Sequence, residues 1–88
     1  MTTNELKRFI ELCLIQTIVF YRIDRDDPDY PVRWEVWAYG YEGTAVGKIE
    51  GPLKNSSRTR ENKVYTSLDR AYTAMKNLNF NGRFEIDG

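Results

Sequence analysis

Four aspartates lie within six residues of the segment 24–31, which reads DRDDPDYP. Clustered carboxylates could hold a divalent cation, because hard cations bind several oxygen ligands. Asp24, Asp26 and Glu35 fit the first, third and twelfth positions of a calcium loop, but Pro28 and Asp29 break its fifth and sixth positions. We therefore expect no metal here. A solvated turn and an acidic docking patch remain as interpretations, and the residues concerned are Asp24, Asp26, Asp27 and Asp29.

The sequence offers little for nucleophilic catalysis, because it contains one cysteine, Cys13, and no histidine. An activated thiol or hydroxyl needs a neighbouring base, which is usually histidine. Cys13 falls on the apolar stripe of an expected helix, so we interpret it as a small buried hydrophobe. The sequence also has no phosphate-binding glycine loop and no zinc-type spacing of ligands. We expect a protein that is not an enzyme and that uses no cofactor.

A second polar segment, 53–63, reads LKNSSRTRENK and carries four basic side chains against one glutamate. Such a loop can contact phosphate groups or an acidic patch on a partner protein. Polar loops of this kind are equally typical of solvated surface. The candidate binding residues are Lys54, Arg58, Arg60 and Lys63.

Aromatic residues recur at every second or third position of the stretch 33–41, which reads RWEVWAYGY. A period of two indicates a strand with one face toward the core. We expect Trp34 on the core face, whereas the other face presents the candidate partner-binding residues Trp37, Tyr39 and Tyr41. A tight turn at 42–43 and a second arm at 44–50 would complete a hairpin. The Gly-Pro pair at 51–52 is expected to end that arm.

The remaining elements follow from apolar periodicity and from capping residues. The expected elements are helices at 3–15 and from 68 to about 78, and strands at 17–23, 33–41, 44–50, 64–66 and 83–86. Val19, Tyr21 and Ile23 are expected to face the core, as are Phe84 and Ile86. The sequence therefore predicts an α+β domain of order α-β-β-β-(β)-α-β. Its mainly antiparallel sheet would have four to five strands, with two helices packed on one face.

Length and charge limit the function further. With 88 residues the chain fits a single domain, 1–88, and its 13 basic and 13 acidic groups cancel. A net charge of zero argues against a global basic field for nucleic acid. A single cysteine fits a reducing compartment, and the apolar run 9–21 is too short and polar to span a bilayer. We expect a cytoplasmic protein.

Residues 32–87 resemble small accessory proteins of plasmids, phages and other mobile genetic elements. The resemblance rests on the runs WEVWAYG, GPLKNSSRTR and VYTSLDRAYTAMKNLNFNGRFEID. Some proteins of that group inhibit host defence complexes, which implies a host protein as a partner. The group has no defining functional motif, so the resemblance transfers no site residues.

Three functions compete on these grounds. Neutral charge, missing catalytic groups and spare aromatic residues favour a small protein-interaction module, and the resemblance implies an inhibitor of a host defence complex. The alternative is a nucleic-acid-binding accessory protein that uses the 54–63 loop, with Trp37 and Tyr39 as stacking platforms. The third is a homodimer formed through the aromatic sheet face.

Overall fold

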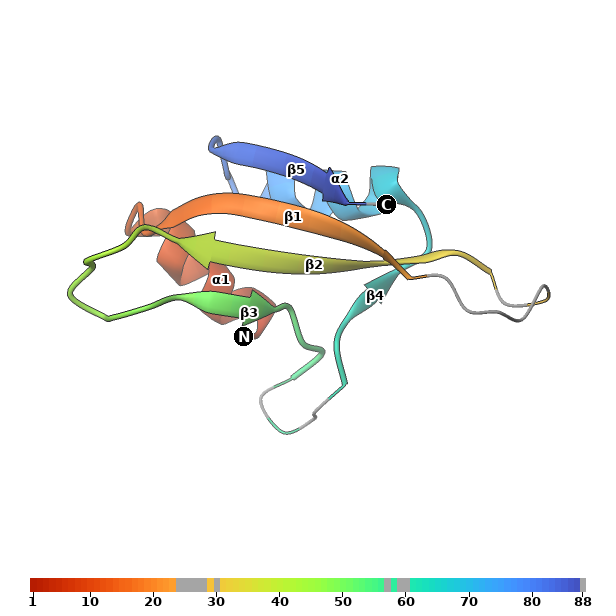
Figure 1. Ribbon diagram of the computed structural model, residues 1–88, viewed down its shortest axis with the longest axis horizontal. Helices are drawn as coiled ribbons and strands as arrows, with labels where there is room; N and C mark the ends of the chain where they lie inside the picture. Colours follow the sequence, from red (N-terminus) through yellow and green to blue (C-terminus); the bar gives the residue numbers. More distant parts are fainter. Residues whose placement is uncertain (24–28, 30, 57, 59–60, 88) are drawn as a thin grey trace.

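The computed structural model describes residues 1–23, 29, 31–56, 58 and 61–87 (Figure 1). The elements in chain order are α1 (Thr3–Glu11), β1 (Ile15–Ile23), β2 (Arg33–Gly40), β3 (Glu50–Pro52), β4 (Val64–Tyr65), α2 (Leu68–Asn77) and β5 (Arg83–Asp87). The predicted α+β class and order of elements are confirmed. Neither helix in the described residues has the length and apolar character that a membrane crossing requires.

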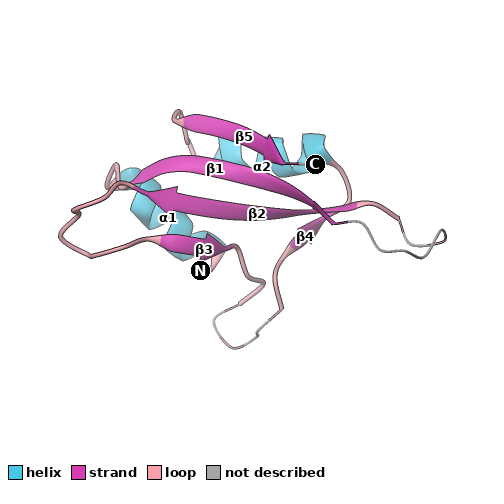
Figure 2. Cartoon of the chain, viewed as in Figure 1, coloured by secondary structure: helices cyan, strands magenta, loops and turns pink. Residues whose placement is uncertain are grey.

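The five strands form one mixed sheet in the order β3-β2-β1-β5, with β4 also paired to β2 (Figure 2). β2 is antiparallel to β1, β3 and β4, whereas β5 runs parallel to β1. The prediction of a mainly antiparallel sheet is wrong in this respect. α2 precedes β5 and carries the chain across the sheet, and such a crossover is how parallel strands become neighbours.

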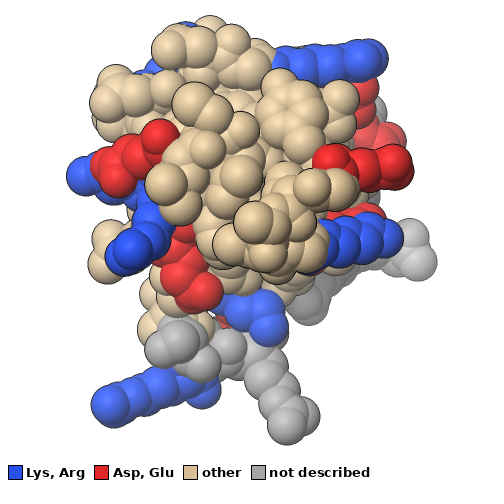
Figure 3. All heavy atoms as spheres, turned by 90° about the vertical axis from the view of Figure 1, so that its left-hand side faces the viewer, with Lys and Arg blue, Asp and Glu red and all other residues tan. Residues whose placement is uncertain are grey.

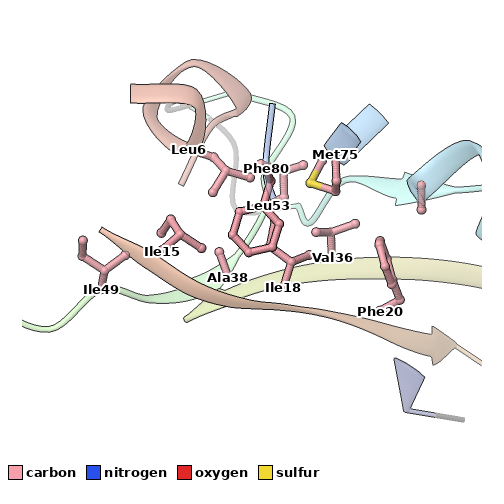
Figure 4. Close-up of a cluster of buried hydrophobic side chains, with 11 residues drawn as sticks. Leu6, Ile15, Ile18, Phe20, Val36, Ala38, Ile49, Leu53, Met75 and Phe80 are labelled. Carbon is pink, nitrogen blue, oxygen red and sulfur yellow. The ribbon is translucent and has the colours of Figure 1, made fainter. Parts of the chain in front are cut away.

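One apolar cluster joins both helices to the sheet. Ile18 lies opposite Ala38 and Phe20 opposite Val36 on the two central strands, so these four side chains share a face. All are almost fully buried, together with Leu6 of α1 and Met75 of α2 (Figure 4). Burial of such side chains is the main favourable contribution to folding.

The predicted core face of β1 is wrong. Phe20 and Ile18 face the cluster, which places Val19, Tyr21 and Ile23 on the opposite face. Ile18, Val19 and Phe20 are consecutive and all buried, so this strand lacks the alternation that would have fixed its orientation.

The second arm of the predicted hairpin begins later than expected. Thr44 donates its hydroxyl to the Gly47 carbonyl at 2.6 Å, which makes a turn where the strand was expected. Gly43 and Gly47 both adopt positive φ, at 74° and 83°, and so suit this loop. The strand β3 instead contains the Gly-Pro pair that was expected to end it. Pro52 occupies an edge strand, where a missing N–H can be tolerated.

The first helix ends at Glu11 rather than near residue 15. Its predicted capping box is confirmed, because Thr2 Oγ1 accepts the Glu5 N–H at 3.2 Å and Glu5 accepts the Thr2 N–H at 3.1 Å. At the other end the Leu14 N–H reaches the Phe9 carbonyl at 2.9 Å, which closes a Schellman motif. Cys13 takes the left-handed position of that motif, with φ of 57°.

Two residues expected in the core are exposed. Cys13 lies past the end of α1 and is exposed, so its predicted burial is wrong. Ile86 was expected to point inward with Phe84, but it is 62% exposed at the last strand. Phe84 does pack on the cluster, where its ring stacks on Phe20 with centroids 5.7 Å apart.

Candidate functional site

The sheet face opposite the core cluster, called the open face here, carries three aromatic side chains close together. Tyr21 comes from β1, and Trp37 and Tyr39 come from β2; these three form the aromatic cluster. Val19 lies directly opposite Trp37, and Thr17 lies opposite Tyr39. Antiparallel pairing and a side-chain period of two therefore place the cluster on one surface.

Direct contacts connect the cluster. The hydroxyl oxygens of Tyr21 and Tyr39 are 2.9 Å apart, and the Tyr21 ring meets the Trp37 ring edge to face with centroids 5.8 Å apart. Trp37 Nε1 donates to Glu35 Oε1 at 3.3 Å, and Asn62 Nδ2 donates to Glu35 Oε2 at 3.0 Å. These contacts hold the rings in defined orientations. The side chains therefore lose less conformational entropy when a partner binds.

The cluster lines a shallow hollow of about 400 Å³ on the open face. Its lining residues are Tyr21, Arg22, Ile23, Glu35, Trp37 and Tyr39. The aromatic residues are partly exposed, so the hollow combines apolar surface with accessible hydroxyl and carboxylate groups. Amphipathic aromatic surface of this kind is typical of contact points between proteins.

Carboxylates surround the aromatic cluster. Glu50, Glu85 and Asp87 lie on the open face in the strands beside it, because they pair with Tyr39, Val19 and Tyr21 in the sheet. Lys48 Nζ pairs with Glu50 at 2.8 Å, and Arg83 pairs with Glu85 at 2.8 Å. Within the described part of the chain, Glu35 and Asp87 form no ion pair.

The ionisation of Tyr39 reflects this environment. The hydrogen bond with Tyr21 is the largest cause that raises the pKa of Tyr39 to about 12, followed by burial and by the nearby carboxylates Glu50 and Asp87. Each of these effects disfavours the phenolate. Of these causes, the charges of Glu50 and Asp87 would also disfavour a further negative group beside Tyr39.

The structure brings together two of the three predicted aromatic residues. Trp37 and Tyr39 lie in the cluster, whereas Tyr41 lies beyond the end of β2 and is 48% exposed. The Tyr41 N–H donates to the Leu14 carbonyl at 3.0 Å, which places it beside the end of α1. Figure 3 faces that end of the molecule, where both signs of charge surround a largely uncharged centre.

The predicted basic residues do not join the aromatic cluster. Lys63 Nζ lies 5.4 Å from the centroid of the Tyr65 ring, and Tyr65 pairs with Trp34 on the core side of the sheet. Burial raises the pKa of Tyr65. Lys54 is partly buried and donates its backbone N–H to the Met1 carbonyl at 2.7 Å.

The other charged candidates lie on loops. Arg58 is exposed, and its backbone N–H reaches Ser56 Oγ at 3.3 Å, whereas Arg60 lies outside the described residues. Asp29 is exposed, and the other members of the predicted acidic patch, Asp24, Asp26 and Asp27, also lie outside the described residues. Among the described residues, no group of three or more potential ligands could hold a metal ion.

Sequence reasoning missed two contributors to this surface. Tyr21 was expected in the core, and only the orientation of β1 places it beside Trp37. Asn62 belongs to the polar segment but contacts Glu35 across 27 residues of chain, which no local pattern indicates. A scan against protein-family models, a search of curated proteins and a search of solved structures each found no match to this chain.

Proposed function

We propose that this chain is a small, non-catalytic protein-interaction module that binds a partner protein through its open face. In this proposal the two helices pack together against the core side of the sheet, which leaves the aromatic cluster accessible. The supporting observation is that Tyr21, Trp37 and Tyr39 form a connected and partly exposed group. Exposed aromatic patches of this kind commonly mark interaction surfaces.

The charges on the open face favour a partner with basic side chains. Glu35 borders the hollow, and the hydrogen bonds that it accepts from described residues come from two neutral donors, Trp37 and Asn62. A lysine or arginine of the partner would find a carboxylate there, and aromatic rings beside it that attract cations.

The same charges weigh against nucleic acid as the ligand. A phosphate backbone would approach the carboxylates Glu35 and Asp87, and like charges repel. Lys63, one of the residues expected to contact phosphate, lies over Tyr65 on the other side of the sheet. The observations on the described residues therefore favour a protein ligand.

The resemblance to accessory proteins of mobile genetic elements suggests an identity for the partner. In the proposal the partner is a component of a host defence complex in the cytoplasm, and binding of this chain inhibits that complex. The neutral net charge and the small size of the chain are compatible with this role.

Peptide binding tests the chemistry of the surface directly. The probes are an arginine-rich peptide, a glutamate-rich peptide and a single-stranded oligonucleotide, and the readout is tryptophan fluorescence in a Trp34→Phe background, where only Trp37 emits. The arginine-rich peptide should change the emission, and the effect should weaken as salt rises. Tighter binding of the oligonucleotide than of this peptide would contradict the proposal.

A pair of matched variants tests whether the peptide binds at the open face. Glu35→Gln should weaken binding of the arginine-rich peptide, whereas Asp69→Asn should not, because Asp69 is an exposed carboxylate in the first turn of α2. Capture from host lysate, with and without nuclease, would then identify the partner. Equal capture by wild type and by Trp37→Ala would exclude the open face as the binding surface.

A further inference from the structure

The two outer edges of the sheet differ in how they are protected. β3 is only three residues long and includes Pro52, so it offers a poor template for another strand. β5 spans five residues, Arg83–Asp87, without proline. Within the described residues no strand lies along its outer edge, as Figure 2 also shows. An unpaired edge of this length presents backbone donors and acceptors to a further strand.

The side chains of β5 alternate between apolar and charged residues. Phe84 and Ile86 point to the side that carries the core, and Ile86 is 62% exposed. Tyr72 of α2 contacts the Phe84 ring with centroids 5.0 Å apart, yet it is 45% exposed. On the open face the strand carries Arg83, Glu85 and Asp87, so both signs of charge lie along it.

We propose that two copies of this chain associate through the outer edges of β5, paired antiparallel about Glu85 to form one continuous sheet. Residues that face each other in an antiparallel pair point to the same side of the sheet. In this register Arg83 lies opposite the partner's Asp87, and Phe84 lies opposite the partner's Ile86. Each of these pairs occurs twice by symmetry, because a two-fold interface is self-complementary.

Charge excludes one neighbouring register, and the length of the strand disfavours the other. Pairing about Ile86 would place Glu85 opposite the partner's Asp87, and opposed like charges are destabilising. Pairing about Phe84 would leave Asp87 and Ile86 without a facing residue in β5 of the other copy. Pairing about Glu85 uses the whole strand and leaves one like pair, in which each Glu85 has its own Arg83 at 2.8 Å.

The dimer would leave the open face uncovered. A two-fold axis perpendicular to the sheet keeps the aromatic clusters of both copies on the same side. Glu35 and Trp37 take no part in the contact, so the dimer does not depend on the proposed partner binding. Because one pair of short strands buries little area, we expect association to be weak and dependent on concentration.

Sedimentation equilibrium on the full chain tests this contact. The wild-type mass should rise with concentration from 10.4 kDa toward twice that value. Arg83→Asp and Asp87→Arg should each remain monomeric, because each places like charges opposite one another. An equimolar mixture of the two variants should dimerise again, since both facing pairs between positions 83 and 87 are then opposite in sign. A wild-type chain that stays monomeric at millimolar concentration would overturn the proposal.

Two further measurements separate this contact from others. Trp37→Ala should dimerise like the wild type, and loss of the dimer in this variant would overturn the proposal in favour of contact through the aromatic cluster. If a charge variant does not fold, amide hydrogen exchange in the wild-type chain still tests whether two copies associate through β5. Exchange at residues 84–87 should slow as concentration rises, and exchange independent of concentration would overturn the proposal.

Discussion

At the residue scale, the hydrogen bond between Tyr21 and Tyr39 makes a prediction about alkaline stability. The folded chain raises the pKa of Tyr39 from the ordinary 10.0 to about 12. A group whose pKa is higher in the folded state than in the unfolded state stabilises the fold. This contribution is complete at a pH below the unfolded-state pKa, and it is lost as the pH rises through the folded-state pKa. We therefore expect the melting temperature to fall between about pH 10 and pH 12 because of this residue.

Two variants test that assignment. Tyr39→Phe should show a smaller fall in melting temperature over the same pH range, since its ring cannot ionise. Tyr21→Phe should shift the absorbance titration of Tyr39 back toward lower pH, because the hydrogen bond with Tyr21 is the largest cause of the raised pKa. An alkaline melting profile unaffected by either change would refute the prediction.

Two glycines of the sheet should respond oppositely to alanine. A Cβ at Gly40 would lie 2.8 Å from Ile49 Cβ and 2.9 Å from the Leu14 carbonyl oxygen, whereas a Cβ at Gly51 would meet nothing within 4 Å. Gly40→Ala should destabilise the fold by about 1–3 kcal/mol through overpacking. Gly51→Ala should stabilise it by about 0.5–1 kcal/mol, because alanine restricts the unfolded chain. Denaturant unfolding of both variants would check the pair, and a common sign would disprove it.

At the element scale, Ser67 begins α2 by accepting the Arg70 N–H at 3.2 Å on its side-chain oxygen. Ser67→Ala removes this cap and should cost about 1 kcal/mol. Ser67→Asp should restore most of that stability, because aspartate accepts the same bond and its charge suits a helix N-terminus. Thermal unfolding measures both, and an aspartate variant as unstable as the alanine variant would contradict the capping role.

The sequence allowed the helices and strands to be predicted better than the orientation and the pairing of the strands. Capping residues and apolar spacing identified both helices, including the box formed by Thr2 and Glu5. The orientation of β1 could not be predicted, because buried residues lie on both of its faces around Val19. The pairing of β5 with β1 is a long-range choice, and Arg83–Asp87 carries no local signal for parallel or antiparallel pairing.

The candidate site could be predicted only in part. The alternation in β2 correctly placed Trp37 and Tyr39 on the face away from the core. Their neighbour Tyr21 could not be added, because its face depends on the orientation of β1. The bond between Asn62 and Glu35 depends on how a distant segment crosses the sheet. Long-range contacts of this kind follow from the whole fold rather than from local spacing.

At the scale of the whole molecule, we expect folding to be independent of divalent cations. The acidic segment 24–31 departs from the calcium-loop pattern at Pro28 and Asp29. Any ion that bound the native state specifically would raise the melting temperature by mass action. Calcium, magnesium and a chelator should therefore leave the melting temperature unchanged. A rise of many degrees with either cation would refute this prediction and return the four aspartates to consideration as ligands.

We also expect the chain to unfold in one cooperative transition, because a single cluster connects its elements. Leu6 of α1, Phe20 of β1 and Met75 of α2 are each at most 1% exposed within that cluster. Leu6→Ala should cost about 2–5 kcal/mol. Loss of α1 alone would change far-ultraviolet circular dichroism before tryptophan fluorescence, since both tryptophans lie in β2. In a two-state protein the two signals coincide, in the wild type and in the variant alike. Separate midpoints would show that α1 unfolds independently, and that the cluster does not couple it to the sheet.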